Sequence, residues 1–468
     1  MTNNIVTVNV TQTVAPTPST LQSTGALISQ GGTTGVADTI TLLTQLSDLT
    51  SILATAAAIA TLAWSANVVT ATTSSAHGIP SGHSVLVTIA GATPSAYNGT
   101  FLATSTGTTT FTYPLVGNPG AETVPGTWIP AAVSELTAMA TTFFAQGSAQ
   151  AVYVLELGIG SAADGVTALA AYITANPNSN YTPGSVGYFY AYLVPREWGS
   201  ESTYLTFLAG FEATTSKTYF FTTMTTGNYT SYTALMKCVV GLVEAPGIPA
   251  SEFSLASAFY VALNYRPSST NKVTPYAFSF LFGVTPYPTK GNGALLAALK
   301  AAKVNYIGTG AVGGISNTIL FWGTTMDGRP FTYWYSVDWL QITVDIDISN
   351  AVINGSNNPA NPLYFNQDGI NRLQAVGAQT LVNGVTYGLA NGTVTQTEDI
   401  PTDLQTAINS GALAGKLFIN AVPFVPYNVE NPSDYKNGEY DGFTVGYITQ
   451  NGFIHILFNV NVSDFITQ

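Results

Sequence analysis

Near both ends of the chain, apolar residues recur at every second position, the pattern typical of β-strands. Near the N-terminus the apolar residues are Ile5, Val6, Val8 and Val10. Near the C-terminus they are Ile454, Ile456, Phe458, Val460 and Val462. The prolines at 16 and 18 follow the first run and favour extended backbone over helix. Each end of the chain therefore predicts an extended arm that contains a strand.

Two interpretations of these terminal strands are open at this point. They can be edge strands that close a domain of their own chain. Alternatively, they can add to sheets of neighbouring subunits, where backbone hydrogen bonds supply affinity and alternate side chains supply register.

Between the arms, helical and strand periodicities alternate, which predicts a mixed α/β fold with right-handed crossovers and a largely parallel sheet. The predicted strands are 152–157, 188–194, 219–221, 277–283, 304–307, 318–322 and 331–335. The predicted helices are 38–64 (one or two helices), 130–147, 164–176, 201–211, 232–243, 251–264, 294–303 and one that starts at Asp368.

A different pattern interrupts this alternation of helices and strands between about Ala66 and Trp128. Short Val/Thr/Phe segments recur there roughly every ten residues and are separated by glycine, proline and the Asn98-Gly99 turn. This spacing predicts a small all-β domain inserted into the body. The expected organisation is an N-terminal arm at 1–30, an α/β body at 31–65 and 129–290, the insertion at 66–128, and a C-terminal domain at 291–468 that ends in an arm from about 452.

Charge is scarce along all 468 residues. Asp, Glu, Lys and Arg make up 8 % of the chain, and 12 basic against 24 acidic residues give a net charge of −12. Without a basic cluster, nucleic acids and anionic membranes are poor partners. The apolar run 49–64 is too short to span a bilayer and is expected to form a buried helix. The first residues lack the pattern of a secretion signal, so synthesis in the cytoplasm is expected.

A charge-poor exterior needs an explanation, because soluble monomers usually carry charge on about a quarter to a third of their surface. Ser, Thr, Asn, Gln and Gly must cover much of this exterior. Interface cores are depleted in charge. We therefore expect much of the surface to lie against other copies of the chain, as in a polymer subunit.

Candidate chemistry is sparse, and neither a catalytic site, a metal site nor a cofactor is expected. His77, His83 and His455 lack a zinc-ligand spacing, and the first two are expected to be solvated loop residues. Gly308 to Gly313 fits G-x-G-x-x-G, but a strand rather than a helix is predicted after it. The carboxylates Asp345, Asp347, Asp434, Glu439 and Asp441 are expected on the surface, and Cys238 is expected as a buried thiol in a helix.

The order of elements resembles that of the contractile-tail sheath proteins of myophages, in particular a sheath-like group that carries insertions. The resemblance is clearest in the last third of the chain. The segments that carry it are Leu296–Lys303 followed by Val304-Asn305-Tyr306, then Trp322-Gly323-Thr324-Thr325-Met326-Asp327-Gly328, Val337-Asp338-Trp339-Leu340 and Asp368-Gly369-Ile370. One departure is notable: the family has a tube-facing helix after Trp339, whereas residues 342–348 alternate like a strand and include two aspartates.

The resemblance implies a non-enzymatic virion protein that is assembled in the host cytoplasm into a helical array around a tail tube. Its partners would be neighbouring copies, joined through the two arms, the tail tube protein, and baseplate and tail terminator proteins, with no nucleic acid and no membrane insertion. Contraction of the array would drive the tube through the host envelope for genome ejection. Two alternatives are another self-assembling surface or adhesin-type protein and a polysaccharide-degrading enzyme, whose paired carboxylates could come from anywhere in the fold.

Overall fold

The structure is a computed structural model that describes residues 21–391 and 418–453, apart from 183, 213–216, 233–235 and 313–314. The chain divides into two compact units. The first comprises 1–231, 241–264 and 281–287, and the second comprises 232–240, 265–280 and 288–468. The predicted arm residues Ile5 to Val10 and Ile454 to Val462 lie outside the described residues.

The sheet of the first unit has β1 near its centre, in the order β12-β11-β10-β1-β9-β2. The bounds are β1 Gly25–Ser29, β2 Ile40–Leu43, β9 Val152–Glu156, β10 Ala191–Leu193, β11 Tyr219–Met224 and β12 Val239–Val243. β1 pairs in parallel with β9 and β10, β10 pairs in parallel with β11, and the edge strand β2 is antiparallel to β9. The predicted largely parallel sheet is confirmed. However, β1 is fully buried within the range predicted as an N-terminal arm, so that range includes a core strand.

Helices cover both faces of this sheet. On β11, Phe220 contacts Phe207 and Phe211 of α4, whereas the next residue, Phe221, points to the other face and contacts Phe259 of α5. The α-helices of this unit are α1 Leu46–Leu49, α2 Ala132–Phe144, α3 Ala162–Ala175, α4 Ser202–Glu212 and α5 Ser254–Leu263. Short 3-10 turns lie at η1 Leu21–Ser23, η2 Ser95–Tyr97, η3 Asn178–Asn180, η4 Arg196–Ser200 and η5 Tyr229–Tyr232.

The inserted all-β domain is a closed antiparallel barrel with the strand order β3-β4-β7-β6-β5-β8. Its strands are β3 Ala57–Ser65, β4 Val68–Thr73, β5 Ser84–Ala90, β6 Gly99–Gly107, β7 Thr110–Pro114 and β8 Thr127–Pro130. The barrel has its own core, in which the largest side chains are Tyr97, Phe111, Tyr113 and Trp128. This confirms the predicted insertion, although the barrel starts at Ala57, before the predicted boundary at 66.

The helical prediction for 38–64 is therefore wrong apart from the single turn of α1. Alanine favours helix intrinsically, but Ala57 and Ala58 pair with β8, and residues 59–65 pair with β4. Ile59 and Leu62 point into the barrel core. Pairing and burial in the barrel outweigh the local helix preference.

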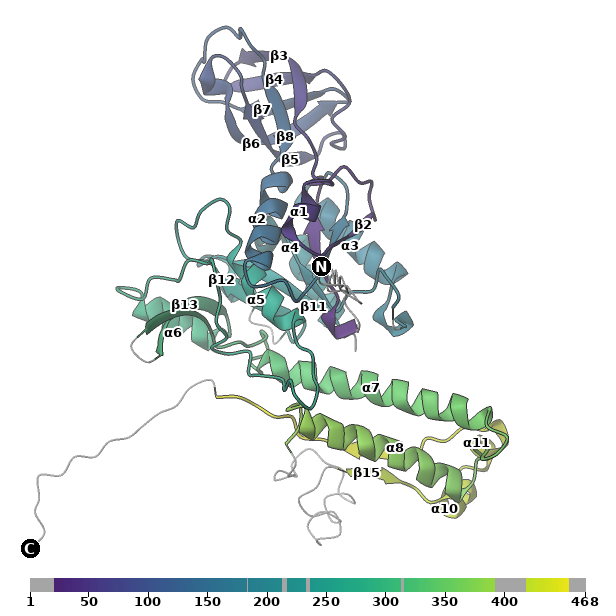
Figure 1. Cartoon of the computed structure of the whole chain (residues 1–468). Helices are drawn as coiled ribbons and strands as arrows, with labels where there is room; N and C mark the ends of the chain where they lie inside the picture. Colours follow the sequence, from purple (N-terminus) through teal and green to yellow (C-terminus); the bar gives the residue numbers. More distant parts are fainter. Residues whose placement is uncertain are drawn as a thin grey trace, which may run out of the picture. The chain divides into compact units, whose positions relative to one another are not determined.

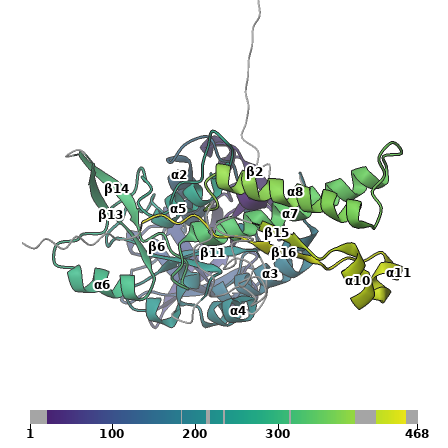
Figure 2. The same ribbon diagram turned by 90° about the horizontal axis from the view of Figure 1, so that it is seen from below.

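The second unit contains a β-hairpin, a pair of long helices and a small two-stranded sheet. Its elements are α6 Gly293–Ala301, β13 Asn305–Val312, β14 Ile315–Phe321, α7 Phe331–Ser356, α8 Gln367–Thr386, β15 Phe418–Ala421, α10 Phe424–Glu430, α11 Pro432–Asn437 and β16 Phe443–Gly446. Helices α7 and α8 lie side by side (Figures 1 and 2). Trp339 of α7 contacts Tyr387, just after α8, and Asp347 accepts a 2.6 Å bond from Thr380.

Three further predictions are wrong in this part of the chain. Residues 331–335 begin the helix α7, which also includes the alternating segment 342–348. Residues 239–243 of the predicted helix 232–243 form the buried strand β12, and Cys238 is buried just before it rather than in a helix. Residues 277–283 form no strand, and only an isolated bridge joins Phe280 to Ile319.

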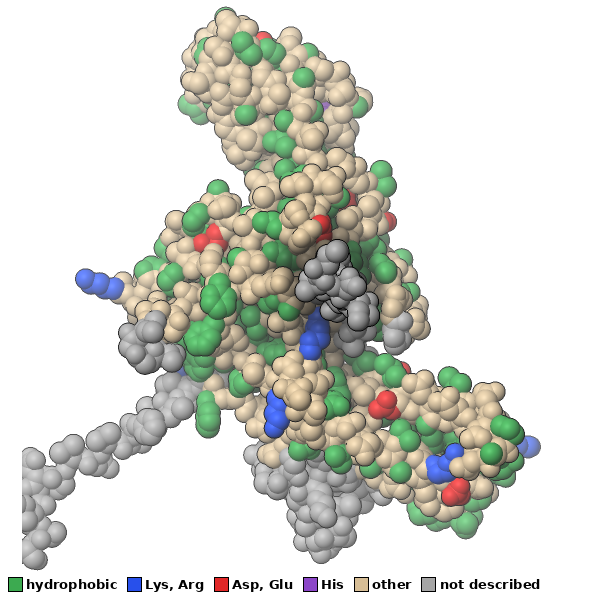
Figure 3. Space-filling model, in the orientation of Figure 1, with side chains coloured by type: hydrophobic (Ala, Val, Ile, Leu, Met, Phe, Trp, Pro, Cys, Tyr) green, Lys and Arg blue, Asp and Glu red, His purple; other side chains and the backbone are tan. Residues whose placement is uncertain are grey.

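Charged side chains are thinly spread on the face shown in Figure 3. The barrel segment 57–130 has a single charged residue other than histidine, Glu122, whose carboxylate accepts the Leu62 N–H at 2.6 Å. Among the described residues, no helix is both long and apolar enough to cross a membrane.

Candidate functional site at the carboxyl edge of the sheet

The carboxyl ends of β1, β9 and β10 form the part of the fold best suited to bind a ligand. After β1 the chain adds β2 and then β9 to the sheet on one side of β1, and afterwards β10 on the other side. In open sheets of parallel strands, such a reversal leaves a crevice between the loops that follow the strands. Here those loops begin at Gln30, Leu157 and Val194.

Glu156, the last residue of β9, fills the polar space beside the β1 loop. Its side chain is buried and accepts hydrogen bonds from the N–H groups of Gly31 (2.6 Å), Thr33 (3.1 Å) and Gly158 (2.9 Å). The hydroxyl groups of Ser29 (2.7 Å) and Thr33 (2.8 Å) donate as well. These donors compensate the buried charge. The backbone N–H groups that could hold an external anion are therefore bonded to the protein's own carboxylate.

Arg196, at the start of η4 beyond β10, is held by three acidic residues. Its Nε and Nη2 donate to the two carboxylate oxygens of Glu244 at 2.7 and 3.1 Å, and Nη2 also donates to the Glu252 carbonyl at 2.7 Å. The guanidinium lies 4.1 Å from the centre of the Phe253 ring. Its backbone N–H donates to Oε1 of Glu135 at 3.0 Å. The bidentate pair with Glu244 offsets the charge of Arg196.

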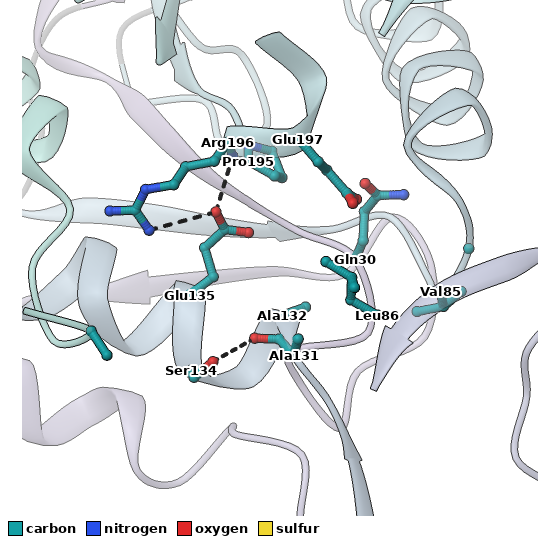
Figure 4. Close-up of a pocket in the computed structure, with 12 residues that line it drawn as sticks. Gln30, Val85, Leu86, Ala131, Ala132, Ser134, Glu135, Pro195, Arg196 and Glu197 are labelled. Atoms are coloured by element: carbon teal, nitrogen blue, oxygen red, sulfur yellow. Dashed lines mark hydrogen bonds and ion pairs between the residues drawn. The ribbon is translucent and has the colours of Figure 1, made fainter. Parts of the chain in front are cut away.

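A cleft of about 410 Å³ lies between these loops, the first turn of α2 and strand β5 of the barrel (Figure 4). Glu135 and Glu197 are the two carboxylates that line it. Figure 4 shows the Glu135 carboxylate directed toward Arg196, whose Nη1 lies 3.9 Å from Oε1 of Glu135. Much of the remaining wall is apolar and includes Val85, Leu86, Ala131, Ala132, Pro195 and Ala250.

Both carboxylates of the cleft are easier to protonate than ordinary glutamates. Burial raises the pKa of Glu135, against the opposing effects of the backbone hydrogen bond from Arg196 and of its positive charge. Partial burial, together with the negative charges of Glu135 and Glu201, raises the pKa of Glu197 to about 7. The positive charge near the cleft is therefore too small to balance the negative charge of both carboxylates.

Of the two barrel histidines, His77 is not the solvated loop residue that the sequence predicts, whereas His83 lies in a loop with 42 % of its side chain exposed. His77 is buried beside Phe111 and Trp128, with Nε2 at 2.7 Å from the Gly107 carbonyl, and its Nδ1 accepts the Ile79 N–H at 3.0 Å. His83 is partly buried, and its Nδ1 lies 2.6 Å from Oδ2 of Asp164, the acidic residue of the α3 capping box. That contact joins the barrel to the α/β body. His455 lies outside the described residues.

The other sequence candidates are dispersed. Gly308 and Gly310 lie within β13, where Phe321 and Ile319 of β14 pack over them, so residues 308–312 of the G-x-G-x-x-G run belong to a hairpin strand. Gly313 lies outside the described residues. Asp345 is exposed on α7, and Asp347 bonds Thr380. The described residues contain no group of three or more His, Cys, Asp and Glu placed to hold a metal ion.

The acidic segment 434–441 departs from the expected solvated turns at Asp434, whereas Glu439 and Asp441 are exposed and lie outside helices and strands. Asp434 lies in α11 and accepts the Tyr427 hydroxyl at 2.8 Å, while the Asp441 N–H donates to that hydroxyl oxygen at 2.8 Å. These bonds hold α10 and α11 together ahead of β16. Asp434 therefore has a structural role.

A second feature of interest is the two-stranded sheet of β15 and β16. The pair is antiparallel, with Ile419 opposite Val445, and the Gln374 side chain of α8 donates to the Ile419 carbonyl at 2.9 Å. Within the described part of the chain, no further strand pairs with either outer edge. Such edges offer unpaired backbone groups to an incoming strand.

The cleft is the feature that the sequence did not indicate. Its lining comes from six separate stretches between Gln30 and Ala250, and its two carboxylates lie 62 positions apart (Glu135 and Glu197). Only the strand order brings them together. The one local signal was Arg196-Glu197, a charged pair directly after a predicted buried strand in a chain with few charges.

Comparison with solved structures shows what the fold is similar to. The chain matches a chain in the cryo-EM structure of the anti-feeding prophage baseplate, determined with six-fold symmetry, with a TM-score of 0.53 and 12 % identity over 99 % of both chains. It also matches a sheath tail protein from Listeria innocua, with a TM-score of 0.39 and 11 % identity over 92 % of this chain and 96 % of that one. No family model and no curated protein matches the chain. The baseplate match shows a shared fold, in agreement with the mixed α/β architecture that the resemblance implied.

Proposed function

We propose that this chain is a structural subunit of a contractile phage tail or a related particle, where it assembles with copies of itself as a sheath-type protein. The observation that carries this proposal is the fold that the chain shares, over nearly its whole length, with a chain of a prophage baseplate. An insertion in one domain, or a common sheet motif alone, would not produce a match over 99 % of both chains.

Two features of the chain support self-assembly. The alternating segments at 4–10 and 454–462 are predicted to be strands that can add to a sheet, and the β15–β16 pair has edges that can accept a strand. About five backbone hydrogen bonds at ~0.5–1.5 kcal/mol each, plus the apolar face of an arm, would link two subunits by several kcal/mol. In a helical array this linkage recurs at every subunit. The scarcity of charge agrees with a surface that neighbouring copies cover.

The finer mechanism follows from this arrangement. Subunits would form a helical array around a tail tube, with the arms keeping neighbours connected while the bodies move as rigid units during contraction. The tail tube, baseplate and terminator proteins would be the partners. The difference in body-to-body contacts between an extended and a contracted array would supply the driving force.

Electron microscopy of the purified protein in negative stain tests the assembly itself. We expect striated hollow tubes or stacked rings. Dispersed monomers or flat lattices at concentrations well above those of assembly would overturn the proposal.

The role of the N-terminal arm is tested by a pair of matched variants. Replacing Val6 and Val8 with lysine places two charges on the apolar face of the predicted strand, and replacing Thr7 and Asn9 places the same charges on its other face. We expect V6K/V8K to reduce the sedimentable fraction about tenfold, since ~1.4 kcal/mol corresponds to a factor of ten. T7K/N9K should change it little. Equal sedimentation of the two variants, or tubes formed without residues 1–14, would contradict the arm hypothesis.

A further inference from the structure

The assembly proposal above assigns no role to the cleft at the carboxyl edge of the sheet, and the chemistry of this cleft supports an inference of its own. Its volume of about 410 Å³ lies within the range of small-molecule sites. It also occupies the position where open parallel sheets usually bind ligands, at the point where the strand order reverses. The barrel contributes Val85 and Leu86 to its wall.

The surroundings of the cleft do not favour an anion. In nucleotide-binding folds of this kind, backbone N–H groups after the first strand bind phosphate. Here the N–H groups of Gly31 and Thr33 donate to the buried carboxylate of Glu156. The cationic side chain that lines the cleft, Arg196, is paired in bidentate fashion with Glu244. A phosphate would therefore meet two carboxylates without an available cation.

The same features favour a cation that carries an alkyl chain. The carboxylates of Glu135 and Glu197 line the cleft, and Leu86, Pro195 and Ala250 are among its apolar walls. An ammonium group could lie between the carboxylates while its methylene groups pack on the apolar wall. Arg196 forms a bidentate pair with Glu244, and its Nη1 also lies 3.9 Å from Oε1 of Glu135. Among the described residues, Glu197 is therefore the cleft carboxylate for which no ion pair is found, and it is the one open to an incoming ammonium group.

We propose that this cleft binds an alkylammonium group, supplied either by a small linear diamine or by a lysine side chain of a second copy of the chain. Both sources present the same chemistry, a primary ammonium on a flexible chain of methylenes. Glu197, on the more open side of the cleft, is the residue that contacts the ammonium group. Glu135 completes the acidic pair and is held in place by the Arg196 backbone.

Calorimetric titration of the full-length protein with 1,4-diaminobutane tests the proposal, with 1-butanol and inorganic phosphate as comparison ligands. We expect the diamine to bind with a Kd of about 1 mM or tighter, and neither comparison ligand to bind measurably. Saturable binding of phosphate in place of the diamine, or equal binding of diamine and butanol, would overturn the proposal.

Matched variants locate the binding site. Glu197→Gln should weaken binding about tenfold or more. Glu201→Gln removes a nearby carboxylate that bonds Thr203 outside the cleft lining, and it should weaken binding far less than Glu197→Gln does. Leu86→Arg leaves both cleft carboxylates in place but puts a tethered cation at the wall, and it should also abolish binding. Circular dichroism verifies that each variant is folded. Equal effects of E197Q and E201Q, or full binding to L86R, would contradict the assignment.

The two sources of the ammonium group are separated by the effect of the diamine on self-assembly. If a lysine of a second copy occupies the cleft, saturating diamine should reduce the sedimentable fraction of the wild type severalfold and leave that of L86R unaffected. If a free amine is the ligand, the diamine should bind without changing sedimentation. Either result supports ammonium binding. A chain that forms no tubes but binds the diamine would contradict the assembly proposal alone.

Discussion

At the scale of single residues, the scarce charges of this chain are concentrated in specific contacts. Glu156 and Glu244 are each surrounded by donors at the carboxyl edge of the sheet. Asp164 caps α3 and contacts His83. Glu122 accepts a hydrogen bond from the Leu62 N–H, next to the register shift in β3. The sequence could show that these residues were rare, but their partners lie up to 127 positions away. Their roles depend on which strands are neighbours in the sheet, and no local sequence pattern indicates that order.

Neutralising Glu156 should destabilise the first unit markedly. Glu156→Gln keeps the size of the side chain but turns an NH₂ group toward donors such as Gly31 and Thr33. Loss of charge-assisted bonds in a buried site should lower the free energy of unfolding by about 2–3 kcal/mol. Urea denaturation followed by fluorescence measures this change. The control Asp345→Asn, at an exposed position on α7, should lie within about 0.5 kcal/mol of wild type. Equal midpoints for both variants would refute this account of Glu156.

The contact between Asp164 and His83 should make stability depend on pH in the acidic range. Burial raises the pKa of Asp164, but hydrogen bonds from Ser161 and His83 outweigh it, so the net pKa is lowered from 3.8. A lowered folded-state pKa means that the contribution is complete above the unfolded-state value and is lost as the pH falls through the folded-state value. Asp164→Asn should therefore cost about 1 kcal/mol at pH 6. The difference from wild type should shrink below about pH 4. Thermal unfolding at a series of pH values measures it, and a difference that stays constant down to pH 2.5 would contradict the prediction.

At the scale of elements, the sequence predicted best where one periodicity dominates and a terminus signal is present. Helix α3 begins at a capping box and α8 at an Asn cap, and both lie close to their predicted ranges. The failures have a common cause. The β3 segment is rich in alanine but pairs in a barrel, and β12 is apolar at every position, so its periodicity cannot separate strand from helix. Helix α7 alternates locally like a strand but packs along α8. Tertiary contacts decided each case.

The barrel should fold as a module of its own. It is closed, has a separate core, and its first and last strands pair with each other, with Ala57 opposite Trp128. Its ends therefore lie about 5 Å apart. We expect residues 55–131 alone to give dispersed amide resonances and cooperative thermal unfolding. We also expect the remaining chain, with a short Gly-Ser linker in place of 57–130, to keep its α/β circular dichroism. A fragment with the spectrum of an unfolded chain would show that the barrel depends on the body.

At the scale of the whole molecule, the fold class and the sheath-type resemblance came from the order of elements rather than from any one motif. The individual motifs are short, and several elements between them, including the long helix α7, were assigned wrongly. The succession of a largely parallel sheet, an inserted β domain and a C-terminal helix from about Asp368 survives those errors. The baseplate match covers this whole succession at only 12 % identity. The fold is shared at a sequence identity so low that single residues carry little information. The same comparison therefore does not identify partners or interaction surfaces, which experiments must test.

Low charge should also determine how assembly responds to salt. Contacts between charged surfaces weaken when the Debye length falls from about 10 Å at 0.1 M to about 3 Å at 1 M ionic strength. Contacts made of backbone hydrogen bonds and uncharged side chains do not, and apolar burial is not weakened by added salt. With charge on only 8 % of residues, the sedimentable fraction should change less than about twofold between 0.1 and 1 M NaCl. The variant V6K/V8K is the control for this prediction. Salt at 1 M should screen the repulsion among its added charges, so its assembly should recover in part. Dissolution of wild-type assemblies at high salt would mean that the few charges, rather than the uncharged surface, hold the subunits together.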